Sequence, residues 1–285
     1  MTRVLIPLLF SGVVAAAATL PAHASDPDAG VHPGLKAAIA GPWRDPANVA
    51  RDAHRHPGPT LAFFGIHPDH TVVEITPGGG WYAEILAPYL RDDGRYVAAV
   101  WDDAIPDQPG YRYRLNTALR AKFAVAPAVY GTPDVLVFDP ADPSFGPPGS
   151  ADAVLTFRNA HNWVEEGNAE EYFAAFFEVL APGGVLGVTD HRAKPDTSLE
   201  TMKSSGYLTE ALVVQLATDA GFELEARSEA NANPADSADH PNGVWTLPPS
   251  NDPDAEYAAK NRAIGESDRM TLRFRKPHGA GNGHQ

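Results

Sequence analysis

One short segment constrains the fold of this chain more than any other, because a β-branched stretch leads almost directly into three consecutive glycines. Residues 71–75 read Thr-Val-Val-Glu-Ile, a composition that favours a buried strand. Gly78, Gly79 and Gly80 follow, and residues 81–90 have the character of a helix. Glycine has no Cβ, so such a loop lets the backbone approach a ligand closely. The segment therefore predicts a strand, a ligand-binding loop and a helix, in that order.

The rest of the chain alternates between strand-like and helix-like stretches, which is the pattern of a mostly parallel sheet covered on both faces. Six further strands are predicted at residues 96–101, 135–138, 153–157, 185–189, 222–226 and 270–274. Helices are predicted at residues 111–123, 169–180 and 207–220. We expect the last two strands to be antiparallel to each other. The sequence thus predicts a doubly wound α/β fold with a seven-stranded sheet, a long insertion before the last strand and no division into two domains.

Both ends of the chain and one internal segment are predicted to lie outside this core. Residues 1–24 combine a positive residue, an apolar stretch and a small-x-small cleavage pattern, which is typical of a signal peptide. We expect residues 25–44 to form a flexible arm, residues 231–268 a long loop or lid, and residues 279–285 a disordered tail. The signal peptide predicts an exported protein, periplasmic or secreted.

The charge balance limits the partners of this protein. The chain has 36 acidic residues against 22 lysines and arginines, a formal net charge of −14. Nucleic acids and anionic membranes select basic patches, so neither is an expected partner. After the leader, no stretch reaches the roughly 20 apolar residues of a spanning helix, and the absence of cysteine excludes disulfides. We expect a small-molecule substrate, most easily a neutral or cationic one.

A short helix is predicted before the first strand. Asp45 is a good N-cap with Pro46 at the first helical position, and Pro57 and Gly58 are expected to end the helix. Its last turn is rich in basic side chains: Arg51, His54, Arg55 and His56. The helix dipole favours cations at this end, which is the simpler interpretation. The alternative is a basic corner that contacts the substrate.

The glycine loop itself admits two interpretations. Gly78-x-Gly80-x-x-Ala83 satisfies the fingerprint of a nicotinamide dinucleotide site, which would make the protein an oxidoreductase. Glu74 points elsewhere, because an acid four residues before the loop glycines is unusual for pyrophosphate binding. Its carboxylate suits the amino group of a ligand.

Residues 74–80 resemble motif I of the class I S-adenosylmethionine-dependent methyltransferases, in which an acid precedes a G-x-G-x-G loop; Thr76 stands here at the first glycine position. The sequence is most similar to that of a group of exported predicted methyltransferases with P-G-G-G-W-Y, F-R-N-x-H-x-W and D-H-R-A segments. In this chain the three segments begin at Pro77, Phe157 and Asp190. The matches span residues 45–275. The resemblance implies a Rossmann-like class I methyltransferase fold, S-adenosylmethionine as cofactor, and methyl transfer to a small molecule.

The resemblance also implies a set of cofactor-binding residues: Glu74, Thr76, Gly78, Gly80, Trp81, Asp102 and Asp139. Asp102, with Asp103 as an alternative, matches the acid that binds the ribose in this family. Asp139, with Asp142 as a weaker alternative, resembles the acid near the adenine amino group. Trp81 either packs at the start of its helix or borders the ligand.

Polar clusters follow the fourth and fifth predicted strands, where open α/β sheets bind their ligands. They supply the catalytic candidates: Arg158, Asn159, His161, His191 and Arg192. Methyl transfer is an in-line displacement that requires alignment, and a base when the nucleophile carries a proton. His161 or His191 could be that base, and Arg158 or Arg192 could hold an anionic substrate. Alternatively these residues cap the strand ends and pair with one another, as Asp190 with Arg192.

Eleven histidines raise the question of a metal. Their spacing does not match that of zinc sites and no thiol ligand is present, so we expect no protein-bound metal. Three functions remain in competition. The first is a methyltransferase. The second is a methyltransferase-like binding or accessory protein, since the predicted signal peptide separates the chain from cytoplasmic S-adenosylmethionine. The third is a nicotinamide oxidoreductase.

Overall fold

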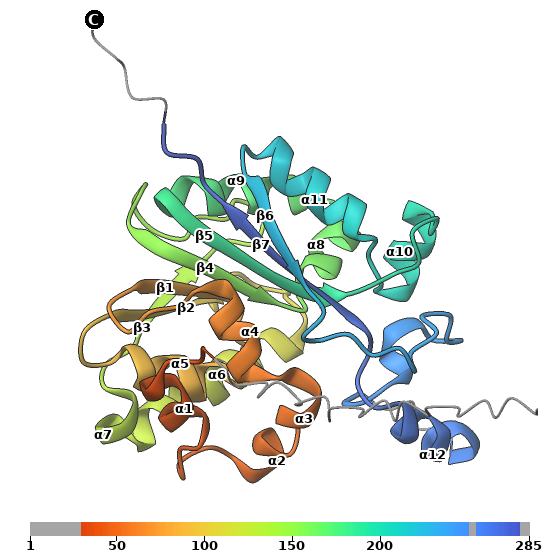
Figure 1. Ribbon diagram of the computed structural model, residues 1–285, viewed down its shortest axis with the longest axis horizontal. Helices are drawn as coiled ribbons and strands as arrows, with labels where there is room; N and C mark the ends of the chain where they lie inside the picture. Colours follow the sequence, from red (N-terminus) through yellow and green to blue (C-terminus); the bar gives the residue numbers. More distant parts are fainter. Residues whose placement is uncertain (1–29, 251–254, 280–285) are drawn as a thin grey trace, which may run out of the picture.

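The computed structural model describes residues 30–250 and 255–279, and seven strands form one sheet within them. The strands are β1 (Thr71–Ile75), β2 (Arg95–Trp101), β3 (Asp134–Phe138), β4 (Ala151–Phe157), β5 (Leu180–His191), β6 (Glu223–Ser228) and β7 (Arg269–Arg275). Their order is β3-β2-β1-β4-β5-β7-β6 (Figure 1). β7 lies antiparallel between β5 and β6, whereas the pairs from β3 to β5 are parallel. The predicted α/β fold is confirmed, including the antiparallel final pair.

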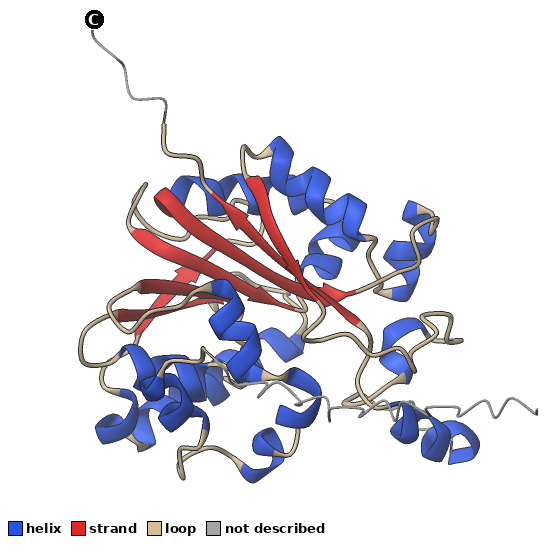
Figure 2. Ribbon diagram, viewed as in Figure 1, coloured by secondary structure: helices blue, strands red, loops and turns tan. Residues whose placement is uncertain are grey.

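Helices cover both faces of the sheet (Figure 2). One layer consists of α1 (Pro33–Ile39), α4 (Pro57–Phe64), α5 (Ala83–Leu90), α6 (Gly110–Val125) and α7 (Pro127–Tyr130). The other consists of α8 (Ala160–Glu166), α9 (Ala169–Val179), α10 (Leu199–Ser205) and α11 (Glu210–Asp219). The short helices α2 (Pro46–Val49) and α3 (Asp52–Arg55) precede α4, while η1 (Gly243–Thr246) and α12 (Ala255–Ile264) precede β7. Among the described residues, no helix is both long and apolar enough to cross a membrane.

Alternate residues of each central strand enter opposite cores. In β1, Val73 and Ile75 join the core that contains α8, α9 and α11, whereas Val72 joins the core that contains α1, α4 and α5. This alternation follows from the two-residue period of a strand, and burial on both faces explains the nearly continuous apolar sequence. Glu74 therefore projects to the same side as Val72. The fold places a carboxylate in an apolar layer, directly before the glycine loop.

The predicted flexible arm of residues 25–44 is wrong for its second half. Residues 33–39 form α1, whose Leu35 and Ala38 are buried in the core shared with α5. Trp43 adds a hydrogen bond from Nε1 to the carbonyl of Glu84, at 2.9 Å. Apolar residues three apart on a helix share one face, which the flanking polar sequence concealed. The predicted signal peptide and residues 280–285 of the predicted tail lie outside the described residues.

The predicted helix after Asp45 is divided in two, α2 and α3. Asp45 does cap α2, accepting a hydrogen bond from the backbone N–H of Ala47 at 2.8 Å. Pro57 begins α4 instead of ending the preceding helix. Proline fits the first position of a helix because its missing N–H would have no partner there. Arg55, the last residue of α3, is buried.

Candidate active site

A cavity of about 310 Å³ lies at the C-terminal ends of β1 and β4. Six of the predicted site residues line it: Glu74, Thr76, Gly78, Trp81, Arg158 and Asn159. Asn159 is fixed by its side-chain amide, which donates to the carbonyl of Ile75 at 3.0 Å. The position agrees with the rule that open α/β sheets bind ligands beyond the carboxyl ends of their strands.

The three loop glycines have different roles. A Cβ added to Gly78 or Gly79 would meet no atom within 4 Å, so this part of the loop borders open space. Gly80 has φ +84°, and a Cβ there would lie 2.8 Å from Cδ1 of Leu119. Gly80 does not line the cavity. The structure therefore does not support the prediction that Gly80 contacts the cofactor. Close packing against α6 already accounts for a glycine at that position.

Two cavity residues have a strained backbone. Thr76 has φ +45° and Arg158 has φ +61°, a region that costs residues with a side chain about 1–3 kcal/mol. Hydrogen bonds to adjacent strands hold both conformations, from Thr76 N to the carbonyl of Ala99 at 2.8 Å and from Arg158 N to that of Thr189 at 2.7 Å. Thr76 thus adopts a backbone conformation that glycine adopts more readily. Strain of this kind is concentrated at functional sites.

Glu74 is 2 % exposed and accepts a hydrogen bond from the hydroxyl of Tyr96 at 2.6 Å. Burial raises the pKa of Glu74 to about 7, although the Tyr96 hydroxyl and the charge of Arg55 oppose the increase. The carboxyl group is therefore close to half ionised at neutral pH. A cationic ligand group would stabilise its charged form.

Basic residues at both ends of α3 belong to the site. Arg51 and Arg55 line the cavity, and the Arg55 guanidinium lies 4.3 Å from the centroid of the Trp81 ring. Of the two interpretations of this helix end, the structure favours the basic corner. The expectation of a neutral or cationic ligand stays a prediction, because the carboxyl group of Glu74 lines the same cavity as these arginines. Nothing in the sequence distinguished Arg55, which stacks on Trp81 in the cavity, from the basic residues next to it.

Glu266 partly compensates these charges. Its carboxylate lies 2.6 Å from Nε of Arg51 and 3.0 Å from Nη2 of Arg269, but 3.8 Å from Nε of Arg55. Burial would raise the pKa of Glu266, but the guanidinium groups of Arg269, Arg51 and Arg55 bring it down to about 2. Sequence reasoning missed Glu266, because it lies in the long insertion, about 200 positions from the arginines of α3.

A second cavity, of about 430 Å³, adjoins the first through shared lining residues Tyr111, Arg158 and Asn162. His161 and His191 line it together with the apolar segment that contains Val244, Trp245, Leu247 and Pro248. The Trp245 ring lies 6.3 Å from that of His161. The segment of the predicted lid thus contributes one wall here, and its opening and closing stays a prediction.

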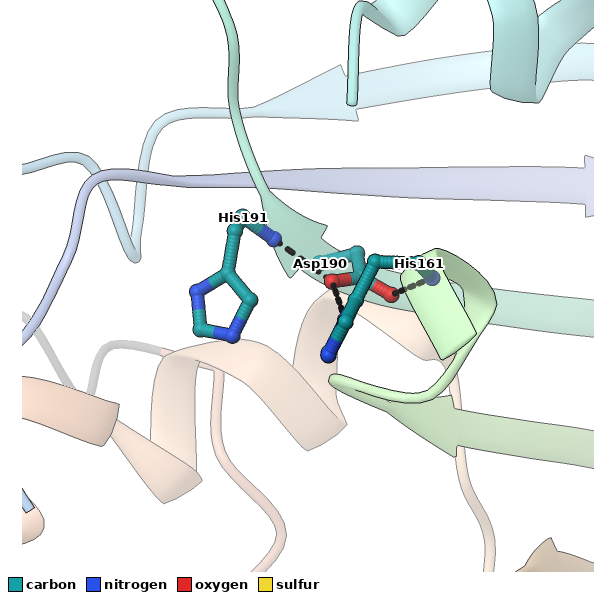
Figure 3. Close-up of side chains that lie close together, drawn as sticks. All are labelled: His161, Asp190 and His191. Carbon is teal, nitrogen blue, oxygen red and sulfur yellow. Dashed lines mark hydrogen bonds and ion pairs between the residues drawn. The ribbon is translucent and has the colours of Figure 1, made fainter. Parts of the chain in front are cut away.

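His161 and His191 flank the carboxylate of Asp190 (Figure 3). Nδ1 of His161 lies 2.9 Å from Oδ1 of Asp190, and Nδ1 of His191 lies 2.5 Å from Oγ of Ser267. With each Nδ1 occupied, the Nε2 atoms are the ring nitrogens left for a ligand. Burial lowers the pKa of His191 well below its usual value, and His161, Arg158, Arg269 and Arg55 lower it further. A neutral imidazole can accept a proton.

His161, Asp190 and His191 also place possible metal ligand atoms within 4.8 Å of one another. Two observations favour an orienting role for Asp190 instead. Its carboxylate already accepts hydrogen bonds from the backbone N–H groups of both histidines. In addition, the nearby guanidinium groups of Arg158 and Arg269 oppose a cation. That the protein binds no metal stays a prediction.

Three other predicted residues do not line either cavity: Asp102, Asp139 and Arg192. Asp102 and Asp139 follow β2 and β3 as expected, but each carboxylate accepts a hydrogen bond within its own turn, from Ala104 N and Ala141 N. The alternative Asp103 is paired with Arg120.

The prediction that Arg192 holds a substrate is wrong. Its guanidinium binds Asp268 and Glu229, each at 2.8 Å, and Glu210 at 3.2 Å, beside a different cavity. The alternative pair of Asp190 and Arg192 is also absent, because the Asp190 carboxylate binds His161 and the backbone of His191, whereas the Arg192 guanidinium binds other acidic residues.

Comparison with solved structures shows the class I methyltransferase fold. A SAM-dependent methyltransferase from Aquifex aeolicus aligns with a TM-score of 0.52 and 14% identity over 88% of this chain and 98% of its own. The [4+2]-cyclase SpnF has a TM-score of 0.52 and 16% identity, with 86% and 92% covered. A proposed sarcosine dimethylglycine methyltransferase from Galdieria sulphuraria has a TM-score of 0.52 and 14% identity, with 81% and 88% covered. No family model and no curated protein matches the chain.

Proposed function

We propose that this protein is an S-adenosylmethionine-dependent methyltransferase that acts on a small molecule. One observation carries the proposal: in a sheet of methyltransferase topology, the open loop at Gly78 and Gly79 and the carboxyl group of Glu74 border the same cavity. Backbone without a Cβ leaves room for the adenosyl amino acid, and Glu74 offers a partner for its ammonium group.

The neighbouring residues have distinct proposed roles. Asp102 and Asp139, at the ends of β2 and β3, would contact the ribose and the adenine after a change of side-chain conformation. When bound, S-adenosylmethionine supplies a methyl group on a sulfonium, which becomes a thioether as the new bond to the acceptor forms. The acceptor would occupy the second cavity, where His161, oriented by Asp190, accepts its proton. Asn159 fixes the end of β1 relative to β4.

Calorimetric titration of the full chain with S-adenosylmethionine and S-adenosylhomocysteine tests this function. We expect saturable binding and a thermal shift with both ligands. Absence of heat and of any shift at millimolar ligand would exclude it. NAD is the control, because the order of this sheet, with its antiparallel β7, differs from the parallel order of dinucleotide-binding folds. The topology therefore counts against the oxidoreductase alternative.

A second function is a binding or accessory protein that retains this fold. Two observations favour it: a similar structure is named as a [4+2]-cyclase, so the fold alone does not fix the reaction, and the sequence of residues 1–24 has the features of an export signal. Binding of another metabolite without turnover of S-adenosylmethionine would support it. We also propose export to the periplasm or beyond, which is tested by determining the N-terminal residue of the protein recovered from that compartment.

A further inference from the structure

The junction of the two cavities holds more positive charge than its surroundings compensate. Arg158 lines both cavities, and Arg55 lines the first. Nε of each side chain is buried and has no hydrogen-bond partner within the described part of the chain. A buried charged donor without a partner is costly, so such groups are normally paired.

The acidic groups nearby are already occupied. Glu266 lies close to Arg51 and Arg269, and farther from Arg55. Asp190 accepts hydrogen bonds from His161 and His191. Glu74 is bonded to Tyr96, and burial keeps much of it protonated at neutral pH. Within residues 30–250 and 255–279, no carboxylate forms an ion pair with Arg158, and Glu266 and Asp190 act on it only from farther away, although the whole chain carries a net charge of −14.

The conformation of Arg158 adds a second line of evidence. Its backbone is held at φ +61°, and burial together with Arg269 lowers its pKa to about 10. Both effects cost free energy, and in the described part of the chain no hydrogen bond of Nε offsets them. Val244, Trp245 and Leu247 form an apolar side of the second cavity. A ligand that satisfies both parts has an anionic end and an apolar body.

We propose that Arg158 is the binding residue for a carboxylate on the acceptor, and that the acceptor is a small organic acid with an apolar or aromatic body. The placement of this carboxylate on the methyl acceptor rests on the proposed methyltransferase function. The fork of the guanidinium matches a carboxylate in two parallel hydrogen bonds. Arg55 remains free to face the methyl donor in the first cavity.

The test compares two probes of equal shape, benzoate and benzamide, at matched ionic strength. Their affinities are measured by calorimetry for the full chain, with and without saturating S-adenosylhomocysteine. We expect benzoate to bind about tenfold or more tightly than benzamide, the ratio expected for one charge-assisted hydrogen bond. Equal binding, or no binding of benzoate at millimolar concentration, would overturn the proposal.

Three variants assign the effect to Arg158. Arg158→Met should abolish the preference for benzoate, Arg158→Lys should retain part of it, and Arg114→Met, on the exposed face of α6, should leave it unchanged. The melting temperature of ligand-free Arg158→Met should equal or exceed that of the wild type, because an uncompensated charge is removed. A large decrease would instead show that Arg158 is structural, and the proposal would fail.

The same measurements separate this proposal from the methyltransferase function. If Arg158→Met loses affinity for S-adenosylhomocysteine but keeps the preference for benzoate, Arg158 binds the methyl donor and the assignment is wrong. If the wild type binds no S-adenosylhomocysteine, the methyltransferase function fails. A preference for benzoate that depends on Arg158 would still establish the carboxylate site, then as part of a binding protein.

Discussion

Oδ1 of Asp190 lies 2.9 Å from Nδ1 of His161 and also accepts a hydrogen bond from the backbone N–H of His191, at 2.8 Å. Through these two bonds the buried carboxylate holds the end of β5 and the first turn of α8 together. It also selects the tautomer of His161 with the proton on Nδ1, which leaves Nε2 as the acceptor.

Asp190→Asn should weaken the link between β5 and α8 and also the selection of the His161 tautomer. The reason is that an amide NH₂ replaces one of the two acceptor oxygens. We expect a loss of about 1–3 kcal/mol in the free energy of unfolding, measured with urea. Nitrogen NMR of the imidazole should show that His161 no longer has a single tautomer. Asp219→Asn, at the exposed end of α11, is the control and should change neither. An unchanged tautomer in Asp190→Asn would contradict the orienting role.

Binding of S-adenosylmethionine should strengthen as pH rises from 6 to 7.5. The pKa of Glu74 is raised to about 7, so its carboxyl group is mainly protonated at pH 6 and gains the charge that attracts an ammonium group above pH 7. The α-amino group of the ligand, with a usual pKa of about 8, sets the upper limit. Calorimetry in buffers of different ionisation enthalpy should detect proton release near pH 7.

Two variants control that measurement. Glu74→Gln should weaken binding and remove its pH dependence, whereas Glu165→Gln, exposed on α8, should preserve both. Tyr96→Phe should move the pH dependence upward, because the hydrogen bond from Tyr96 lowers the pKa of Glu74. An affinity that is flat between pH 6 and 7.5 in the wild type would argue against Glu74 as the ammonium partner.

Adjacent glycines of the loop should respond differently to alanine. Gly79→Ala introduces a Cβ into open space, so the free energy of unfolding should change by less than about 1 kcal/mol, while affinity for S-adenosylmethionine falls about tenfold or more. Gly80→Ala should destabilise the fold by about 2–4 kcal/mol, through the clash with Leu119 and the positive φ. Denaturation and calorimetry of both variants check this. Equal ligand affinity in Gly79→Ala and the wild type would mean that the loop does not contact the ligand.

Glu266 should make the protein sensitive to acid. Because the pKa of Glu266 is lowered to about 2 in the folded state, it stabilises the fold above its unfolded value of 4.5. That contribution is lost as pH falls from about 4.5 toward 2. Glu266→Gln leaves Arg51 and Arg269 without their carboxylate, which should cost about 3–5 kcal/mol at pH 7.

The matched variant for this prediction is Glu225→Gln, which removes a more exposed carboxylate paired with Arg273 and Arg275. Surface pairs contribute about 0–1 kcal/mol, so its effect should be much smaller. Urea unfolding of both variants between pH 3 and 7 provides the comparison. If the two variants lose similar amounts of the free energy of unfolding, the arginines around Glu266 are solvated and need no buried partner.

Local sequence determined most of the secondary structure of this protein. The limits of β1 are those predicted, because β-branched residues and the glycines after them specify a strand and its end without help from distant residues. Asp45 caps its helix and Gly221 follows α11 with a positive φ, for reasons contained in a few neighbouring residues. The cluster of Glu74 and the glycine loop could also be predicted, since one strand and one turn contain it.

Only the tertiary structure decided which charged residues meet. Glu266 reaches Arg51 across more than 200 positions, and Arg192 turns to Glu229 and Asp268 instead of the site. The charge balance of the whole chain gave no indication that arginines gather at one cavity. Coulombic interactions depend on distance in space and on burial, and neither is set by separation along the chain. The site at the junction of the two cavities is for this reason a property of the fold.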